Sequence, residues 1–375
     1  MIRDLAMTLM MGPGVPVPAP RMVLDALQSV KVVSETGATQ SGFELSFHID
    51  RNSPLVSLFM LSGGAAVPFF RVLVIVTLSG KAETLIDGVA TQTQMAPGSG
   101  STPATLTVQG KDMSAAMDVL PFDGLPYPAM PPVARVALVC AKYAFLGVVP
   151  MPIPSLEEPP IPTDRIPRHD GTDLAYVRAL AEEAGYIFRM NPGPTPGTSI
   201  AYWGPDIRVG LPQPALTIDS GHADTVENLS FRFDKEGTEI PIVYIQNQQT
   251  RAPIPIPIPG EIPFLPPLGV VPPLPPKVTP LRNTAQLSPV QALVRGFAYA
   301  VQHSKAIKGS GTLDVMRYGR MLSAGGTVGV RGTGLAFDGL HYVEQVTSTI
   351  DRTSFKQDFN LTRSGLLPSL PTVPV

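Results

Sequence analysis

The chain has 375 residues, with 28 Lys and Arg against 30 Asp and Glu and a formal net charge of -2. Nucleic-acid binders need a dense basic face to neutralise phosphates, and this charge balance argues against one. Because the chain has one cysteine, it can form neither an intrachain disulfide nor a multi-cysteine metal site. Charged residues make up only 15%, against roughly 25% in an average globular protein. We therefore expect apolar or neutral surface that is buried against partners.

The N-terminal residues do not form a convincing signal peptide, because Asp4 interrupts the apolar stretch and Gly12-Pro13-Gly14 ends it. The most apolar later stretch, 133–149, contains charged residues and then runs into prolines. It is not expected to span a bilayer. Its cysteine, Cys140, has apolar neighbours and is expected to be buried. The sequence thus predicts cytoplasmic assembly without membrane insertion.

A six-residue phrase occurs twice, as Leu45-Ser46-Phe47-His48-Ile49-Asp50 and as Leu229-Ser230-Phe231-Arg232-Phe233-Asp234. In both copies apolar and polar residues alternate, which is the period of a half-buried strand. Two further pairs follow in the same order: 86–89 with 337–340, both containing Asp-Gly, and 106–108 with 361–363. Three matches in register predict a duplicated β-domain in which each phrase superposes on its partner.

Residues 1–128 are predicted to form the first of two tube-like antiparallel β-barrels. The strands are expected at 31–33, 43–50, 71–89 and 104–109, and the third range is a hairpin that turns at Ser79-Gly80-Lys81. The run 72–76 is rich in β-branched residues, as in a strand buried on both faces.

Residues 129–208 are predicted to form a small α+β insert. One helix is expected over 133–145, with Gly147 closing it. A second is expected over 173–183, with Thr172 or Asp170 as its N-cap and Gly185 at its C-terminal stop. The strand 186–190 follows. The fold class is therefore mainly β with an α+β insert.

The second barrel is predicted to begin in 209–252 and to resume in 289–375, where a helix over 289–306 starts after Ser288. Between them lies a Pro-rich arm, 253–288. Because proline has no amide to donate to a ladder, we expect polyproline-II-like or unpaired backbone there. An extended arm could reach a neighbouring subunit, so its prolines are the candidate interface residues: Pro253, Pro255, Pro257, Pro259, Pro266, Pro272 and Pro276.

No catalytic, metal or cofactor motif is legible in the sequence. Asp87 and Asp338 share an Asp-Gly context, which is typical of turns. His169, just before a helix, is interpreted as part of a cap instead of a proton relay, and Trp203 as a packed corner instead of a sugar platform. No enzymatic activity and no cofactor are therefore expected.

Several segments resemble those of one family, and they occur in the family's order: 171–177 with Leu180-Ala181 and Gly185-Tyr186, Ala201-Tyr202-Trp203-Gly204-Pro205, 110–114 with Met117-Asp118, and 330–332, 337–343 and 356–363. They are similar to phage late control D proteins, the baseplate hub proteins of contractile phage tails and contractile injection systems. The resemblance covers most of the chain but not the Pro-rich arm.

This resemblance implies a structural protein that forms a homotrimer, in which six tube-like barrels adapt a sixfold inner tube to a threefold spike. The implied partners are a spike protein, an inner tube or tube-initiator protein and other baseplate components, within a phage-like contractile particle or virion. Two other readings stay open. One is a particle-borne carbohydrate- or peptidoglycan-directed enzyme, and the other is a binding module whose arm is a ligand for an aromatic groove.

Overall fold

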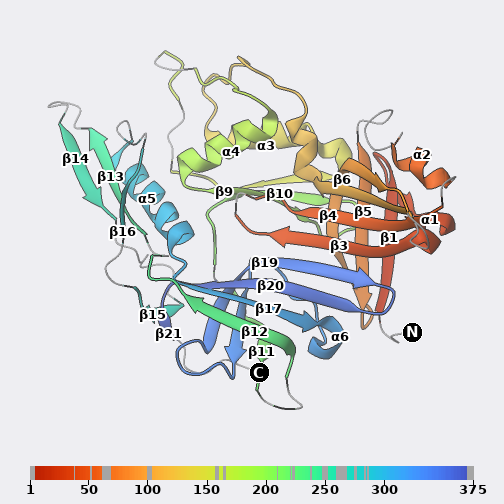
Figure 1. The fold of residues 1–375 in the computed structure, drawn as a ribbon. Coiled ribbons are helices and arrows are strands. Elements are labelled where there is room, and N and C mark those ends of the chain that lie inside the picture. Colours follow the sequence, from red (N-terminus) through yellow and green to blue (C-terminus); the bar gives the residue numbers. More distant parts are fainter. Residues whose placement is uncertain are drawn as a thin grey trace.

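A computed structural model describes residues 5–37, 39–50, 53–60, 69–98, 104–156, 160–163, 166–208, 210–219, 221, 224–236, 239–246, 252–258, 268–273, 277–282, 284 and 287–369. The fold is mainly β, and a large sheet occupies its centre. A helix-and-strand unit lies above this sheet in Figure 1, and a helix with three short strands lies beside it.

The large sheet has 13 strands in the order β12-β17-β20-β19-β3-β4-β7-β6-β5-β1-β2, with β18 beside β19 and β11 beside β18. Its first half consists of β1 (Leu5–Pro13), β2 (Val17–Pro18), β3 (Leu27–Glu35), β4 (Gly42–Ile49), β5 (Phe70–Leu78), β6 (Lys81–Ala96) and β7 (Ala104–Asp112). Its second half consists of β11 (Gln213–Thr217), β12 (Val226–Phe233), β17 (Ile307–Asp314), β18 (Thr327–Arg331), β19 (Gly339–Asp351) and β20 (Phe355–Arg363).

Short helices that the sequence did not predict lie between these strands: α1 (Arg21–Ala26), α2 (Pro54–Met60), η2 (Met113–Asp118) and α6 (Val315–Tyr318). The predicted hairpin is confirmed. β5 and β6 turn through Ser79 and Gly80, which both have positive φ, as a two-residue hairpin turn requires.

The two halves repeat one strand order. The series β3-β4-β7-β6-β5-β1 corresponds to β12-β17-β20-β19-β18-β11. Two β-bulges recur at the same places: Gln28 and Glu227 are skipped in the first strand of each series, and Thr91 and Glu344 in the fourth. Because a bulge fixes register, each paired residue of one half has a definite counterpart in the other. The last strands of the two series differ, since β1 runs antiparallel to β5 in continuous register whereas β11 runs parallel to β18 with a register shift between Gln213 and Leu216.

The structure thus supports a duplication, but the predicted correspondence is wrong. The phrase at 45–50 lies in β4, whereas the phrase at 229–234 lies in β12, which is the counterpart of β3. Alternation alone cannot separate them, because neighbouring half-buried strands share it. Asp87 lies within β6, whereas Asp338 precedes the first residue of β19, and the pairings make Leu340 the counterpart of Asp87.

Two closed barrels were predicted, and the pairings of the described residues do not close either half. Instead the halves join edge to edge, because β19 pairs antiparallel with β3 from Gln345↔Glu35 to Asp351↔Ser29. One apolar core cluster contains residues of both halves, with Phe47 from the first and Leu361 from the second both fully buried. Because β3 and β19 are far apart in the sequence, no local sequence pattern predicts that they pair.

The helix-and-strand unit contains α3 (Pro132–Ala141), η3 (Ala144–Leu146), β8 (Val148–Pro152), α4 (Asp173–Ala184), β9 (Ile187–Pro192) and β10 (Ser199–Gly204). The predicted helix over 133–145 is split, since α3 ends at Ala141. The other expected ends are confirmed. The Thr172 hydroxyl accepts from the Ala175 amide at 3.2 Å, and Gly147 and Gly185 cap η3 and α4 with positive φ. The strands pair in the order β8-β10-β9.

The Pro-rich arm is not unpaired where it is described. β14 (Pro253–Pro257) pairs antiparallel with β13 (Glu239–Gln246), and β16 (Lys277–Pro280) pairs with β13 in parallel. Farther along, β15 (Gly269–Val271) pairs with β21 (Leu366–Pro368). The prediction failed because the prolines stand at every second residue of β14. The intervening Ile254 and Ile256 keep their amides for the side that faces β13, and an edge strand needs donors on one side only.

Helix α5 (Pro289–His303) covers this small sheet, and it begins after Ser288, as predicted. Ser288 and Gln291 form a capping box. Ile258 and Val243 are fully buried under α5. A Cβ added to Gly296 would lie 2.4 Å from the Ile258 side chain, so the helix approaches the arm more closely than a residue with a Cβ would allow. The described part of the arm therefore packs within its own chain.

Candidate functional site

A buried ion pair joins the large sheet to the helix-and-strand unit. The Arg71 Nε on β5 donates to Asp87 Oδ1 on β6 at 2.7 Å, and the two side chains are 5% and 0% exposed. Arg71 also donates to the Gly197 carbonyl at 2.7 Å, and the Ser199 hydroxyl donates to Asp87 at 3.2 Å. Asp87 is therefore not a turn residue. It lies inside a strand, and its partners hold β10 against the sheet.

Asp338 does fit the turn interpretation. Its carboxylate accepts from the amide and the hydroxyl of Thr333, both at 2.8 Å, and Gly339 has a φ of 112°. Asp87 and Asp338 therefore have different roles and do not form a catalytic pair.

A second polar cluster lies under the N-terminus of α4. Asp173, whose side chain is 0% exposed, accepts from Lys142 at 2.8 Å and from the Tyr143 hydroxyl at 2.8 Å. His169 was predicted to be part of the helix cap, but it does not cap the helix. Its Nε2 lies 3.4 Å from Asp173, its Nδ1 lies 2.9 Å from the Tyr127 hydroxyl, and burial lowers the pKa of its imidazole. These groups bind one another inside a core, which is a structural arrangement.

Trp203 and Cys140 are both interior residues, as predicted. The Trp203 ring is 0% exposed and meets the Tyr186 ring edge-on at 4.8 Å between centroids, so it offers no face to a sugar. Cys140 is buried, and burial raises the pKa of its thiol to about 12. A thiol with so high a pKa is not a nucleophile at neutral pH.

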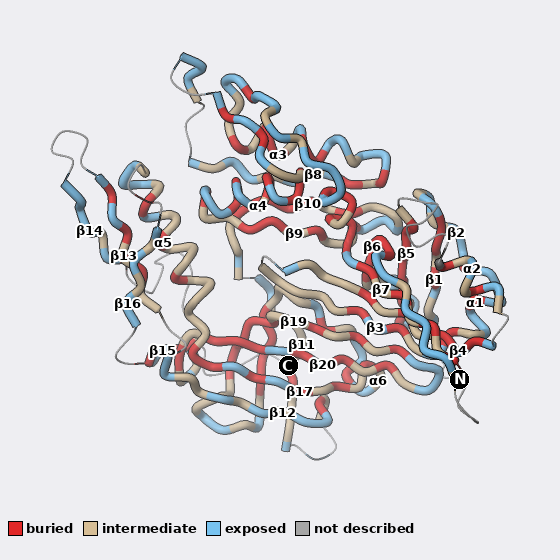
Figure 2. Tube along the Cα trace, turned by 45° about the horizontal axis from the view of Figure 1, so that its top comes forward, coloured by how far each residue is buried: buried red, intermediate tan, exposed pale blue. Residues whose placement is uncertain are grey.

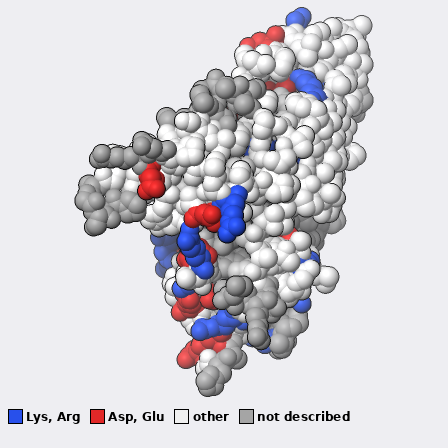
Figure 3. All heavy atoms as spheres, turned by 90° about the vertical axis from the view of Figure 1, so that its right-hand side faces the viewer, with Lys and Arg blue, Asp and Glu red and all other residues white. Residues whose placement is uncertain are grey.

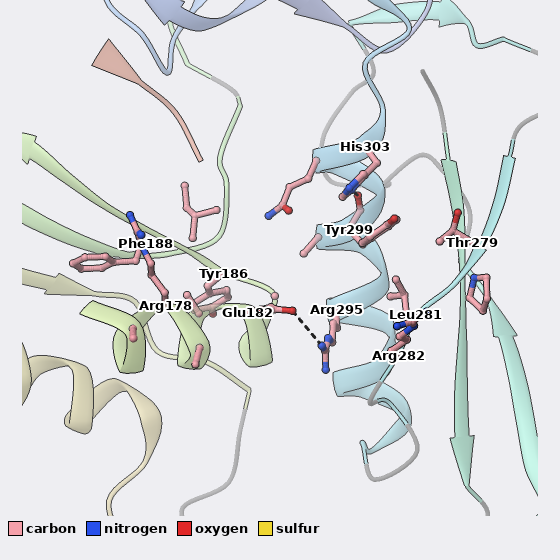
Figure 4. Close-up of a pocket in the computed structure, with 18 residues that line it drawn as sticks. Arg178, Glu182, Tyr186, Phe188, Thr279, Leu281, Arg282, Arg295, Tyr299 and His303 are labelled. Atoms are coloured by element: carbon pink, nitrogen blue, oxygen red, sulfur yellow. Dashed lines mark hydrogen bonds and ion pairs between the residues drawn. The ribbon is translucent and has the colours of Figure 1, made fainter. Parts of the chain in front are cut away.

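A cleft of about 900 Å³ is lined by residues of α4 and α5 (Figure 4). Arg178, Arg282 and Arg295 line it, and its one carboxylate among the described lining residues, Glu182, lies 3.8 Å from Arg295. The Glu182 side chain is 81% exposed. A glycosidase needs two carboxylates facing each other across its cleft, so this lining does not match that chemistry. Among the described residues no group of His, Cys, Asp and Glu could hold a metal ion.

The junction between the halves has a polar side and an apolar side. On the polar side the Gln345 amide donates to the Glu35 carboxylate at 2.6 Å, and the Thr36 hydroxyl donates to the Glu344 carbonyl at 3.0 Å. Toward the core, Val32 faces Ser348 across the pairing, and the two are 1% and 4% exposed. Sequence analysis missed this junction entirely.

Several strand edges of the large sheet have no partner strand on one side among the described residues, and two of them, on β12 and β6, occur in the repeated series. β12 pairs with β17 on one side only, and β6 from Gln92 to Ala96 pairs with β7 on one side only. Figure 2 shows how exposure varies along these strands. Leu229, Phe231 and Phe233 alternate along β12 and are only partly buried.

The surface has few charges over a wide area. Figure 3 shows a face on which uncharged atoms predominate and the charged side chains gather in small groups. Pro253, Pro255, Pro257 and Pro272 are exposed. The other candidate interface residues, Pro259, Pro266 and Pro276, lie outside the described residues. No described helix is long and apolar enough to cross a membrane.

Known structures with the same fold include phage tail proteins. A tail protein from Neisseria meningitidis MC58 superposes with a TM-score of 0.63 at 13% identity, covering 97% of this chain and 98% of that chain. The 43 kDa tail protein of prophage MuSo2 from Shewanella oneidensis gives 0.62 at 12% identity, covering 96% and 99%. A chain of the half-lidded Francisella PdpA–VgrG complex gives 0.57 at 8% identity, covering 100% and 60%.

No family model and no curated protein matches the sequence. At identities this low the structural likeness establishes the fold. The chain has the fold of these tail proteins, and the predicted resemblance agrees with the structure at the level of the fold.

Proposed function

We propose that this protein, which has the fold of phage tail proteins, is the structural baseplate hub of a contractile particle. In this role a homotrimer joins a sixfold inner tube to a threefold spike. The single observation that supports the proposal most is the repeated six-strand series, because one chain presents the same unit twice. Three such chains offer six similar units to a sixfold tube while keeping threefold symmetry for the spike.

The domain division follows this role. Residues 1–128 and the two segments 209–252 and 289–375 form the tube-like units, 129–208 form the insert between them, and 253–288 form the arm. The junction between β19 and β3 supports treating the two units as neighbours in one ring, because it joins them side by side through main-chain pairing. In the assembled ring the six units would close into the tube-like form that the single chain leaves open.

The partners in this proposal are the spike protein, an inner tube or tube-initiator protein and other baseplate components, met in the cytoplasm during assembly of a phage-like particle. The likeness to a chain of the Francisella PdpA–VgrG complex supports an assembly role. The exposed prolines of β14 are proposed as a contact for one of these components. We propose no enzymatic activity, since the buried clusters are structural and the arginine-lined cleft lacks opposed carboxylates.

Light scattering on the purified protein, alone and with its candidate spike protein, tests the proposal. We expect the mass of three chains in at least one of the two samples. A stable monomer in both would contradict the hub. Peptidoglycan zymograms run beside it are expected to be blank, and turnover that one carboxylate substitution abolishes would favour the enzyme instead.

A further inference from the structure

The junction between β19 and β3 has an unused counterpart elsewhere in the chain. The shared strand order and the shared bulges make β6 the counterpart of β19, and β12 the counterpart of β3. The pairing that holds the two halves together therefore defines a second pairing, between β6 and β12. Within one chain these strands lie far apart in the sheet, separated by β17, β20, β19, β3, β4 and β7.

We infer that β12 of one subunit pairs antiparallel with the segment Gln92–Ala96 of β6 in the next subunit. The register follows from the internal junction, in which Gln345 faces Glu35 and Thr349 faces Lys31. It places the partners as Gln92 with Asp234, Thr93 with Phe233, Gln94 with Arg232, Met95 with Phe231 and Ala96 with Ser230. A second copy of this chain is thus the occupant of the open edges of β12 and β6.

Burial along the two counterpart strands supports this occupant. In β3 the core-facing Val30 and Val32 are each 1% exposed, because β19 covers them. Their counterparts in β12, Leu229 and Phe231, are only partly buried, and Met95, which would face Phe231, is 38% exposed. Burying these larger apolar side chains is favourable by roughly 25 cal/mol per Å² of apolar surface.

The polar side of the proposed pairing is complementary as well. At the internal junction the Gln345 amide donates to the Glu35 carboxylate. The counterparts are Gln92 and Asp234, so the same amide-to-carboxylate hydrogen bond can form between subunits. Gln92 and Gln94 are exposed along the β6 edge, and no described strand covers that side. Hydrogen bonds to a charged acceptor contribute more than neutral ones.

The pairing is heterologous, because β12 and β6 are different surfaces, so copies join head to tail and close into a ring when the rotation permits. Alternating internal and intersubunit junctions of one geometry would space the repeated units evenly around that ring. This inference rests on the proposed function only for the number of copies. The register is derived from the internal junction alone.

Cysteine cross-linking tests the register directly. The variant carries Gln94→Cys and Arg232→Cys, a pair on the outward side of the proposed ladder, and the native Cys140 is buried and does not interfere. Mild oxidation should give covalent oligomers with the mass of three chains on a non-reducing gel. The matched positive control is Val33→Cys with Thr347→Cys, the counterpart pair inside one chain, which should give an intrachain disulfide and no oligomer.

The register control moves one cysteine by a residue, as Gln94→Cys with Phe233→Cys, which places the two thiols on opposite faces and should cross-link at least tenfold less. Light scattering on the unmodified protein separates the possible failures. A trimer in solution without cross-links overturns the inferred pairing but leaves the hub. Cross-linked chains that grow without limit support the pairing and contradict the trimer. Equal cross-linking in both registers also overturns the pairing.

Discussion

Replacing Arg71 with threonine should destabilise the protein strongly. The change removes the guanidinium from a carboxylate whose side chain is 0% exposed, and it leaves Asp87 with only the Ser199 hydroxyl among its side-chain partners in the structure. Breaking a buried ion pair by removing one partner costs about 3–5 kcal/mol, because an uncompensated charge stays in the interior. Arg71 also loses its bond to the Gly197 carbonyl, so the helix-and-strand unit should loosen first.

The second half of the chain supplies the matched control. By register, threonine and leucine stand at the counterparts of Arg71 and Asp87, namely Thr327 and Leu340. The double variant Arg71→Thr with Asp87→Leu leaves no buried charge, so it should lose less stability than Arg71→Thr alone. Urea unfolding of the wild type, the two single variants and the double variant measures this coupling. A cost below about 1 kcal/mol for Arg71→Thr, or simple additivity, would refute the reasoning.

The pH dependence gives an independent check of the same variant. Burial raises the pKa of Asp87, and Arg71 opposes that rise. Without Arg71 the pKa should rise further. Between the unfolded-state pKa of about 3.9 and the raised native pKa the native state binds more protons than the unfolded state, so the free energy of unfolding falls as pH increases. The deficit of Arg71→Thr should therefore shrink as pH is lowered toward the native pKa of Asp87, and a deficit independent of pH would contradict this assignment.

Three further outcomes are expected. Burial lowers the pKa of His341 to about 3, so the free energy of unfolding should fall as pH decreases from about 6.5 toward 3, where only the unfolded state gains this proton. His341→Leu should remove that part of the pH dependence, and an unchanged pH dependence would show that His341 is not its source. Ile258→Ala should cost about 2–5 kcal/mol in urea unfolding, because Ile258 is fully buried under α5, whereas an arm that docks only on other subunits would lose nothing. Gly110→Ala should destabilise by about 1–3 kcal/mol, since its Cβ would lie 2.3 Å from the Phe43 ring; Gly210→Ala, with open space around it, is the control, and equal melting temperatures would contradict the close packing.

Local features of this fold were predictable, and distant pairings were not. Thr172, Ser288 and Gly185 mark helix ends through chemistry that acts within a few residues, so they could be read directly. The hairpin at Ser79 and Gly80 is equally local. The junction between β19 and β3 depends on which strand edges meet after folding, and the residues on either side carry only ordinary alternation.

The repeated phrases illustrate the same limit. The sequence pointed to a duplication, and the strand order supports one, but the matched phrases lie on β4 and β12, which are not counterparts. The two bulges that do establish register, at Gln28 and Thr91 and their counterparts, have no distinctive residue type. Duplicated units can thus retain geometry after their sequences have diverged, because register is constrained by the core and not by residue identity. Of the candidate site, the arm's interface residues stay a prediction.

The prolines of β14 make two edges of the same chain behave in opposite ways. Pro253, Pro255 and Pro257 recur at the period of the strand, so the outer side of β14 carries carbonyl groups without amide donors. A further strand could not hydrogen-bond there in a continuous ladder, and the small sheet is protected against unintended growth or aggregation at that side. β12 contains no proline, and its outer amides remain able to donate. Strand addition is thereby excluded at the outer side of β14 and left to edges of the large sheet such as β12 and the segment Gln92–Ala96 of β6, and because these two edges differ, assembly has a direction.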